Sequence, residues 1–420
     1  MATDGLAYPD PETTERGDEG DGVLRRQAPS FFSKVSLAGY IYSVKGFLTP
    51  MLWLRDWREY FYPPDGQPNI IKTYECRPDL PIRIFFPQSY DQTSPHTLPT
   101  LFTIHSGGFC LGSSRDDDEW NRAFADKHDI LVIALNYSKA PASPFPIGLH
   151  DVEALLLAAL ADESLPIDRT TPRLYSRPGL GRTAILGFSA GGNLAMSVSQ
   201  LPDVKSHPNT PAAAISIYGC LDLSVPAEEK IKNRPWKGSL PAPRGNLTDS
   251  LVGLVPAFDW SYIPYGHDLR DPLLSPHFAE RDNLPPYTCL VAAELDMLAH
   301  ESWRMACRLA GKQVPDRESD DPTWRICGNE YISAKKGELL LGMEDERFAF
   351  EKNWEDDDNE GRSGGGGVKW LLVPDALHGF DSPHIRRVMG GEETIDDAEV
   401  KTKLVTDELA RWLTERVWRS

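Results

Sequence analysis

The sequence predicts an α/β fold with a mostly parallel central sheet and helices on both of its faces. Short, apolar, β-branched runs recur from about residue 70 onward and are bounded by Gly, Pro or Asp. Such runs are typical of strands that are buried on both faces. Helical patterns lie between them, and strands that alternate with helices form parallel sheets. With 420 residues, of which 40% are hydrophobic and 25% charged, the chain can bury a large core.

The expected elements follow one another along the chain. An early pair of strands comes first, at IIKTYEC (70–76) and PIRIFF (81–86). The later, buried strands are LPTLFTIH (98–105), ILVIALNY (130–137), TAILGF (183–188), AAAISIYG (212–219), YTCLVAAELD (287–296) and VKWLLVPD (368–375). Helical periodicity predicts helices at 151–161, directly after residue 189, at 301–312 and at 396–417.

Composition divides the chain into several regions. Residues 1–28 are polar and acidic, which predicts disorder, and residues 29–66 are abruptly aromatic and aliphatic and are expected to form an N-terminal cap segment. Residues 67–420 form the main domain. Within it, residues 224–286 are rich in Pro, Trp and Tyr and are expected to be a cap insertion over the sheet edge. Residues 313–367 contain EDDDNEGRSGGGG and are expected to be a flexible insertion.

The aromatic N-terminal stretch admits two interpretations. It is nearly long enough to cross a bilayer, which takes about 20 apolar residues. However, Lys34 and Lys45 interrupt it, and charges near the centre of a bilayer are costly. We favour an amphipathic cap over the functional site. Peripheral contact with a membrane surface through residues 31–54 is the alternative.

Charge and cysteine usage exclude several classes of protein. The formal net charge of −18 argues against a nucleic-acid partner, because the phosphates would be repelled over most of the surface. The six cysteines form no CxxC pair and no Cys/His pattern suited to zinc, so we expect no metal, no cofactor and no disulfide framework. The acidic N-terminus is unlike a secretory signal, which favours a cytoplasmic protein. Nothing in the sequence sets the oligomeric state.

The strongest chemical signal is Gly187-Phe188-Ser189-Ala190-Gly191, a G-x-S-x-G motif. It follows an expected strand and precedes an expected helix. A strand that turns sharply into a helix exposes the serine hydroxyl at the end of the sheet. Glycines are needed on either side, because larger side chains would collide in so tight a turn. A glycine-rich turn with an idle serine is the simpler alternative.

A second signal is His105-Ser106-Gly107-Gly108-Phe109, which ends another expected strand. A glycine-rich loop lets backbone N–H groups point at a developing oxyanion without a side chain in the way. The loop precedes the serine motif by about 80 residues, where hydrolases with such a serine turn keep an oxyanion donor.

A serine nucleophile needs a base, and the base needs an orienting carboxylate. Asp296 ends a strand, at the sheet edge where catalytic groups of open α/β sheets gather. His378 lies in the loop after the last expected strand. The order Ser189, Asp296, His378 is the order found with strand-turn-helix serines.

Three other residues could fill the roles of acid or base. Asp222 also follows a strand and could be the acid, but that strand comes one too early. His384 lies six residues beyond His378 and fits the loop less well. His105 is more typical of a hydrogen-bonding residue that holds the glycine loop than of a base.

The sequence resembles the hormone-sensitive-lipase-like family of α/β hydrolases, the alpha/beta hydrolase fold-3 group. The resemblance covers about residues 70–312 and 368–415. Its ordered motifs are HSGGF (105–109), NYSKAPASPFPIGLHD (136–151), GFSAGGNLA (187–195), DPLLSP (271–276), DMLAHE (296–301) and HGF (378–380). It implies an α/β-hydrolase fold in which Ser189 is the nucleophile, Asp296 the acid and His378 the base. The implied oxyanion-hole donors are the N–H groups of Gly107, Gly108 and Ala190.

The resemblance and the aromatic cap together favour a carboxylic ester hydrolase that works through an acyl-enzyme on apolar substrates of small to medium size. An acyltransferase or a lactonase could use the same residues. A non-catalytic ligand-binding protein of the same fold is a third interpretation, which the presence of Ser189, Asp296 and His378 disfavours. Phe188 departs from the family by replacing an acidic residue, and we expect it to alter the pocket wall.

Overall fold

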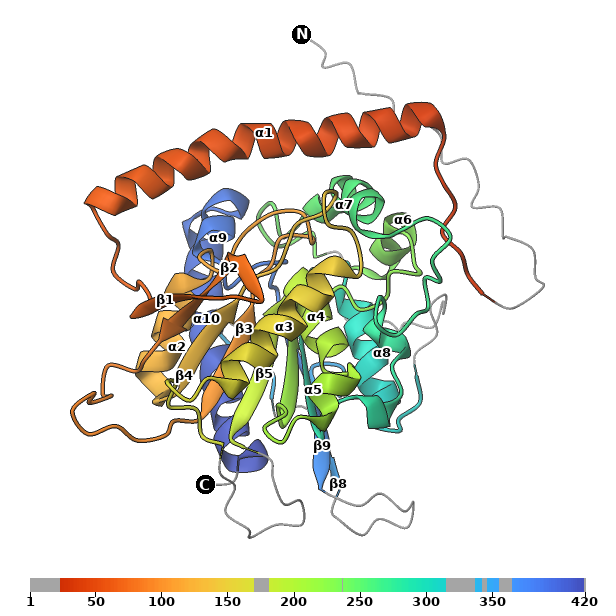
Figure 1. Cartoon of the computed structure of the whole chain (residues 1–420). Helices are drawn as coiled ribbons and strands as arrows, with labels where there is room; N and C mark the ends of the chain where they lie inside the picture. Colours follow the sequence, from red (N-terminus) through yellow and green to blue (C-terminus); the bar gives the residue numbers. More distant parts are fainter. Residues whose placement is uncertain are drawn as a thin grey trace.

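A nine-stranded sheet forms the centre of the protein, as Figure 1 shows. The computed structural model describes residues 23–169, 181–235, 237–314, 337–341, 346–354 and 365–418. The strand order is β1-β2-β4-β3-β5-β6-β7-β9-β8. The strands are β1 (Ile70–Tyr74), β2 (Arg77–Phe85), β3 (Thr100–Ile104), β4 (Leu131–Leu135), β5 (Thr183–Phe188), β6 (Ala213–Ile217), β7 (Tyr287–Ala293), β8 (Ala349–Trp354) and β9 (Gly366–Val373).

The sheet is parallel in its centre and antiparallel at both edges. Strands β4, β3, β5, β6, β7 and β9 run parallel to one another, whereas β1, β2 and β8 pair antiparallel. Every residue of β3, β4, β5 and β6 is buried, as expected for strands with helices on both faces. The predicted mostly parallel α/β sheet is therefore confirmed.

Helices cover the two faces of the sheet and enclose two apolar layers (Figure 1). On one face lie α3 (Ile147–Ala161), α4 (Ala190–Val198), α5 (Pro202–Ser206) and α8 (Ala299–Leu309). On the other lie α2 (Asp118–His128) and α10 (Glu392–Trp412), and α9 (Pro383–Met389) precedes α10. Because the chain alternates between strand and helix, each parallel strand ends at the same edge of the sheet.

Helix α1 (Phe31–Phe61) crosses the molecule above α7 (Val255–Tyr262), and α6 (Ala227–Lys230) lies beside α7 (Figure 1). Ser30 caps the start of α1 by accepting a hydrogen bond from the N–H of Ser33. Of the range 1–28, the first 22 residues lie outside the described part of the chain, and Arg25 pairs with Asp268. Among the described residues, no helix combines the length and the apolar character that crossing a membrane requires.

Strand β8 lies inside the range 313–367, for which the sequence predicted a flexible insertion. It forms an edge strand whose whole length pairs with β9, from Ala349 opposite Leu371 to Trp354 opposite Gly366. Its central residues are exposed and polar, and charged side chains on an edge strand prevent pairing with other chains. Most of the remaining insertion lies outside the described residues.

Candidate active site

Ser189 sits at the sharp turn between β5 and α4, with φ 53° and ψ −115°. Such a backbone conformation costs energy for a residue with a side chain and is typical of functional turns. The turn packs directly against the end of β3, since a Cβ on Gly191 would lie 2.1 Å from the carbonyl oxygen of Ile104. Glycine is therefore required at Gly191, and this close approach brings Ser189 next to the glycine loop that follows β3.

His378 joins Ser189 and Asp296 in one chain of hydrogen bonds. Its Nδ1 lies 2.7 Å from Oδ2 of Asp296, and its Nε2 lies 3.0 Å from Oγ of Ser189. The other carboxylate oxygen of Asp296 accepts the N–H of Leu298 at 2.9 Å. All three side chains are buried. The structure thus brings together the three residues that the sequence singled out.

The charge state of His378 is set by opposing effects. Burial alone would lower its pKa, because a buried imidazolium loses its hydration. The charge of Asp296 and its hydrogen bond to the ring, with smaller contributions from Asp249 and Asp381, outweigh burial and leave the pKa of His378 above its ordinary value. With Nδ1 donating to Asp296, the neutral ring presents the Nε2 lone pair to the hydroxyl of Ser189.

The glycine loop after β3 can supply anion-binding groups. Gly107 and Gly108 have φ values of 125° and 57°, which favour glycine. Their N–H groups donate to no residue that the structure describes. Ala190 is the first residue of α4, so its N–H has no acceptor within the helix. A negatively charged oxygen is favoured at such a helix N-terminus.

The side chain of His105 contacts the glycine loop and helps to order it. Its ring stacks on Tyr137 with centroids 4.4 Å apart, and Nδ1 lies 2.6 Å from the carbonyl oxygen of Ser106. Burial, together with the charge of Lys139, holds the pKa of His105 well below its ordinary value. His105 is therefore a neutral residue that orders the loop.

The rival residues lie elsewhere. Asp222 accepts hydrogen bonds from the N–H and the hydroxyl of Ser224, and His378 is hydrogen-bonded to Asp296 instead. His384 is exposed on α9. The side chain of Phe188 is buried in the core against Trp120, and its expected effect on the pocket wall stays a prediction. Strand alternation points this residue away from the serine-bearing face.

Comparison with known proteins places the chain in a family. Residues 101–319 match the model of the alpha/beta hydrolase fold, which is more than half of the chain. The chain belongs to this family of α/β hydrolases. The resemblance inferred from the motifs is thereby confirmed.

The α/β hydrolase has several curated relatives. It is 31% identical over 187 residues to an arylacetamide deacetylase of Oryctolagus cuniculus, a match that covers 43% of this chain and 44% of the relative. The chain therefore matches less than half the length of this relative. It is 28% identical over 251 residues to carboxylesterase NlhH of Mycobacterium tuberculosis, which covers 60% of this chain and 71% of the relative.

Solved structures share the fold of the α/β hydrolase. A Pyrobaculum calidifontis esterase superposes with a TM-score of 0.57 at 17% identity, over 90% of this chain and 94% of the other. The thermostable carboxylesterase EstE1, from a metagenomic library, gives 0.55 at 21% identity, over 84% of this chain and 92% of the other. At such identities the likeness concerns the fold alone.

Aromatic residues of the 224–286 insertion form a roof over the glycine loop of the α/β hydrolase. A Cβ on Gly108 would lie 2.4 Å from the ring of Phe258, so this ring packs directly on the loop. The ring of Tyr262 stacks on Phe109, with centroids 3.6 Å apart and planes 1° apart. The sequence predicted a cap insertion but did not single out these two residues. Their only signal was the aromatic content of the region.

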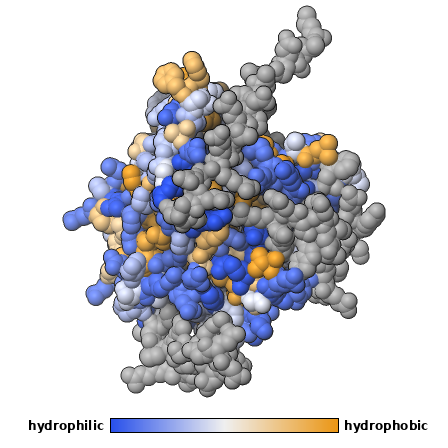
Figure 2. Space-filling view, turned by 90° about the vertical axis from the view of Figure 1, so that its right-hand side faces the viewer, coloured by the Kyte–Doolittle hydropathy of each residue, from blue (hydrophilic) through white to orange (hydrophobic). Residues whose placement is uncertain are grey.

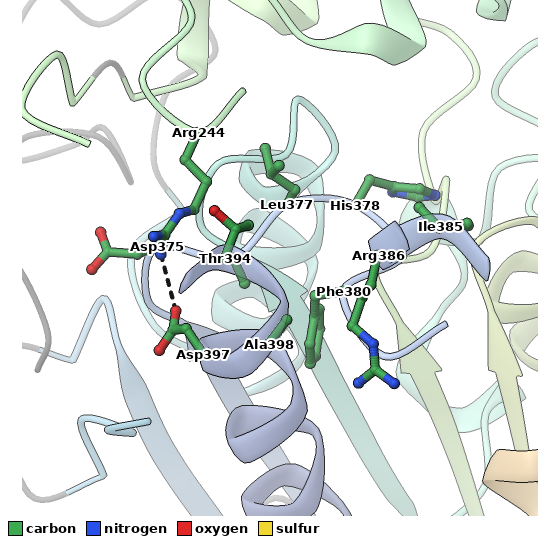
Figure 3. A pocket seen from close by; sticks show the side chains of 12 residues that line it. Arg244, Asp375, Leu377, His378, Phe380, Ile385, Arg386, Thr394, Asp397 and Ala398 are labelled. Atoms are coloured by element: carbon green, nitrogen blue, oxygen red, sulfur yellow. Dashed lines mark hydrogen bonds and ion pairs between the residues drawn. The ribbon is translucent and has the colours of Figure 1, made fainter. Parts of the chain in front are cut away.

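A small pocket lies behind the loop that carries His378, between this loop and the start of α10 (Figure 3). Arg244 and Asp397 face each other there at 3.1 Å. Lys401 donates to Asp397 and to the carbonyl oxygen of Pro374, both at 2.7 Å. The carboxylate of Asp397 is thus shared by two buried cations, and the bond from Lys401 to Pro374 joins the base of the His378 loop to α10.

Proposed function

We propose that this α/β hydrolase is a serine hydrolase that cleaves carboxylic esters through an acyl-enzyme. The observation that supports this most strongly is the position of His378, which is hydrogen-bonded to Ser189 on one side and Asp296 on the other. A serine hydroxyl is a weak nucleophile until a base accepts its proton. The names of the relatives, a carboxylesterase and an arylacetamide deacetylase, agree with acyl transfer to water.

In the proposed mechanism, Oγ of Ser189 attacks the ester carbonyl carbon while Nε2 of His378 takes its proton. The carbonyl oxygen becomes negatively charged and receives hydrogen bonds from the N–H groups of Gly107, Gly108 and Ala190. The C–O bond to the alcohol then breaks as His378 returns the proton to the leaving oxygen. The negative charge of Asp296 stabilises the imidazolium in between.

The acyl-enzyme is hydrolysed by the same groups in reverse roles. Water attacks the acyl carbon, and His378 takes a proton from the water. A second tetrahedral intermediate then collapses, the proton passes to Oγ of Ser189, and the carboxylic acid leaves. In both the formation and the hydrolysis of the acyl-enzyme, His378 returns the proton that it takes up, so the proton balance needs no further group.

The roof residues suggest the class of substrate. Phe258 packs on Gly108 and Tyr262 stacks on Phe109, so the space beside the expected oxyanion position is walled by aromatic rings. Such a wall favours uncharged, apolar acyl or alcohol groups and limits their size. We therefore propose apolar esters of small to medium size. The cytoplasmic location stays a prediction.

A panel of p-nitrophenyl esters of rising chain length tests the proposal, together with an organophosphonate that modifies activated serines. We expect hydrolysis of the shorter esters and a covalent phosphonate adduct on Ser189, located by peptide mapping. An N-aryl acetamide in the same panel tests amide substrates. The control is Ser189→Ala, which should give neither product nor adduct. An adduct at another residue, or no adduct in folded protein, would reject this function.

A further inference from the structure

Helix α1 presents an unusually apolar surface to the outside of the protein. It contains 31 residues, which corresponds to about 46 Å at a rise of about 1.5 Å per residue. Its most exposed side chains include Phe31, Phe32, Phe47, Trp53 and Tyr60, each of which is at least 68% exposed. We call the side of α1 that carries these side chains the outer face. Figure 2 looks at the molecule along α1 and shows hydrophobic side chains standing at its top.

Four charged side chains of α1 turn the other way. They lie on the side of the helix that faces the body of the protein, and each contacts a group there. The contacts are Lys34 over the ring of Tyr265, Lys45 with the carbonyl of Ala140, Arg55 with Asp116 and Glu59 with Arg115. Among the side chains of α1 that the structure describes, Arg58 alone places a charge on an exposed residue.

This arrangement is the reverse of an ordinary surface helix. A helix at the surface of a water-soluble domain turns its charges to solvent and its apolar stripe to the core. In α1 the inward side also packs on the core, where Ile41 is 1% exposed. The inward side is thus held by both apolar packing and ion pairs, whereas the outer face leaves large apolar side chains in contact with solvent. Exposed apolar patches of such an extent mark interaction sites.

We propose that the outer face of α1 docks on a lipid surface, with its rings buried between the headgroups and the acyl chains. Trp and Tyr residues accumulate at this level of a bilayer, because their rings are apolar and their polar atoms can reach water. The outer face carries Trp53, Trp57 and Tyr60 at such exposed positions. It lacks the alternating charges with which a protein partner would fix its register.

The charge of the protein indicates which lipids fit. The net charge of −18 repels anionic membranes, and the exposed part of α1 offers a single arginine rather than a basic cluster. Docking is therefore driven by apolar burial, and zwitterionic lipid is the matching surface. Because this attraction does not depend on ion pairs, it should persist at high ionic strength.

Docking would also place the candidate site at the membrane. Helix α1 packs on α7, and Phe258 of α7 packs on Gly108. Arg55 of α1 pairs at 2.8 Å with Asp116, which in turn accepts the N–H of Ser113 in the segment after the glycine loop. The roof of the site therefore lies next to the docked helix. This last consequence rests on the proposed ester hydrolysis, whereas docking itself does not.

Co-sedimentation with phosphatidylcholine vesicles tests the docking in the absence of any substrate. We expect the full chain to bind, and Phe47→Ser/Trp53→Ser to bind at least about tenfold more weakly, since both substitutions remove apolar area from the interface. The matched control is Leu341→Ser/Val400→Ser, which changes two exposed apolar residues away from α1 and should bind like wild type. Raising the salt from about 0.1 to about 0.5 M should leave binding unchanged.

Three results would overturn the proposal. Wild-type protein that stays in the supernatant would do so, as would an equal loss in the α1 variant and the control. A wild-type dimer that becomes a monomer in Phe47→Ser/Trp53→Ser would show that a second copy covers the outer face instead. Hydrolysis of p-nitrophenyl acetate in solution should be the same in both variants. If vesicle binding is observed but no ester is cleaved, the proposed function fails and the docking stands.

Discussion

Asp249 accepts a hydrogen bond from the backbone N–H of Met297 at 3.0 Å, so the cap insertion contacts the loop that carries Asp296. Arg234, from the same insertion, donates to the carbonyl oxygen of Leu295 at 2.7 Å. These contacts fall on the residues directly before and after Asp296. Residues 224–286 therefore contact the chain on both sides of Asp296, and we infer that Asp249 is a positioning residue.

Replacing Asp249 separates its positioning role from its charge. Asp249→Ala removes the acceptor for Met297, and we expect kcat to fall by on the order of 10- to 100-fold with KM nearly unchanged. Asp249→Asn keeps an acceptor but loses the charge that helps to raise the pKa of His378. It should keep most of kcat and move the acid limb of the pH–rate profile to lower pH. An unchanged profile in Asp249→Asn would contradict this role.

The hydrogen-bonded residues should behave as a unit. Ser189→Ala and His378→Ala should each lower kcat by on the order of 10⁴ to 10⁶, and the double variant should lose little more, because either change abolishes the proton-coupled attack. Asp296→Asn should cost less than either, since the imidazole remains. Steady-state kinetics with one p-nitrophenyl ester measures all four variants.

Asp222→Asn is the matched control for the choice of acid. Its side chain accepts hydrogen bonds from Ser224, so we expect a mild effect on kcat. A larger loss than that of Asp296→Asn, in folded protein, would show that Asp296 is not the acid. If every single variant stayed within a few-fold of wild type, ester hydrolysis by these residues would be wrong.

The sheet could be predicted because its central strands are buried on both faces and therefore read as continuous apolar runs. Strand β8 lacked this signal, since an edge strand needs only one apolar side and its exposed centre, Glu351 to Asn353, reads as a loop. Helix α2 was also missed. Its sequence DEWNRAFADKH is mostly polar, and its apolar face consists of little more than Trp120 and Phe124.

The candidate site could be predicted to the extent that it follows local patterns. Ser189 lies in a turn whose glycines are required by close backbone contacts, and Asp296 and His378 follow strands in a fixed order. Phe258 and Asp249 had no such pattern. Each acts through a contact with a residue 48 or more positions away in the chain, and a single sequence gives no indication of such a pairing.

The pH profile should carry the signature of a buried, carboxylate-paired histidine. Burial lowers the pKa of His378, but Asp296 outweighs it and the net shift is upward. His378 must be neutral to accept the proton of Ser189, so activity is lost as the pH falls through this raised pKa. We expect the acid limb of kcat/KM to lie above the value of about 6.5 of an unperturbed histidine. A substrate without titrating groups is needed, and an acid limb below that value would contradict the expectation.

The contact between Phe258 and Gly108 should control which acyl groups enter. A methyl group on Gly108 would lie 2.4 Å from the ring of Phe258, at a φ of 57° that already disfavours a side chain. We expect Gly108→Ala to lower kcat/KM by on the order of 100-fold, because the loop must shift and misplace its N–H groups. Phe258→Ala should extend the accepted chain length in the ester panel, and it should recover part of the loss when combined with Gly108→Ala. Tyr262→Phe is the control, since it keeps the stacking on Phe109 and should leave the chain-length profile unchanged. Strict additivity of the two changes would show that the ring does not limit the site.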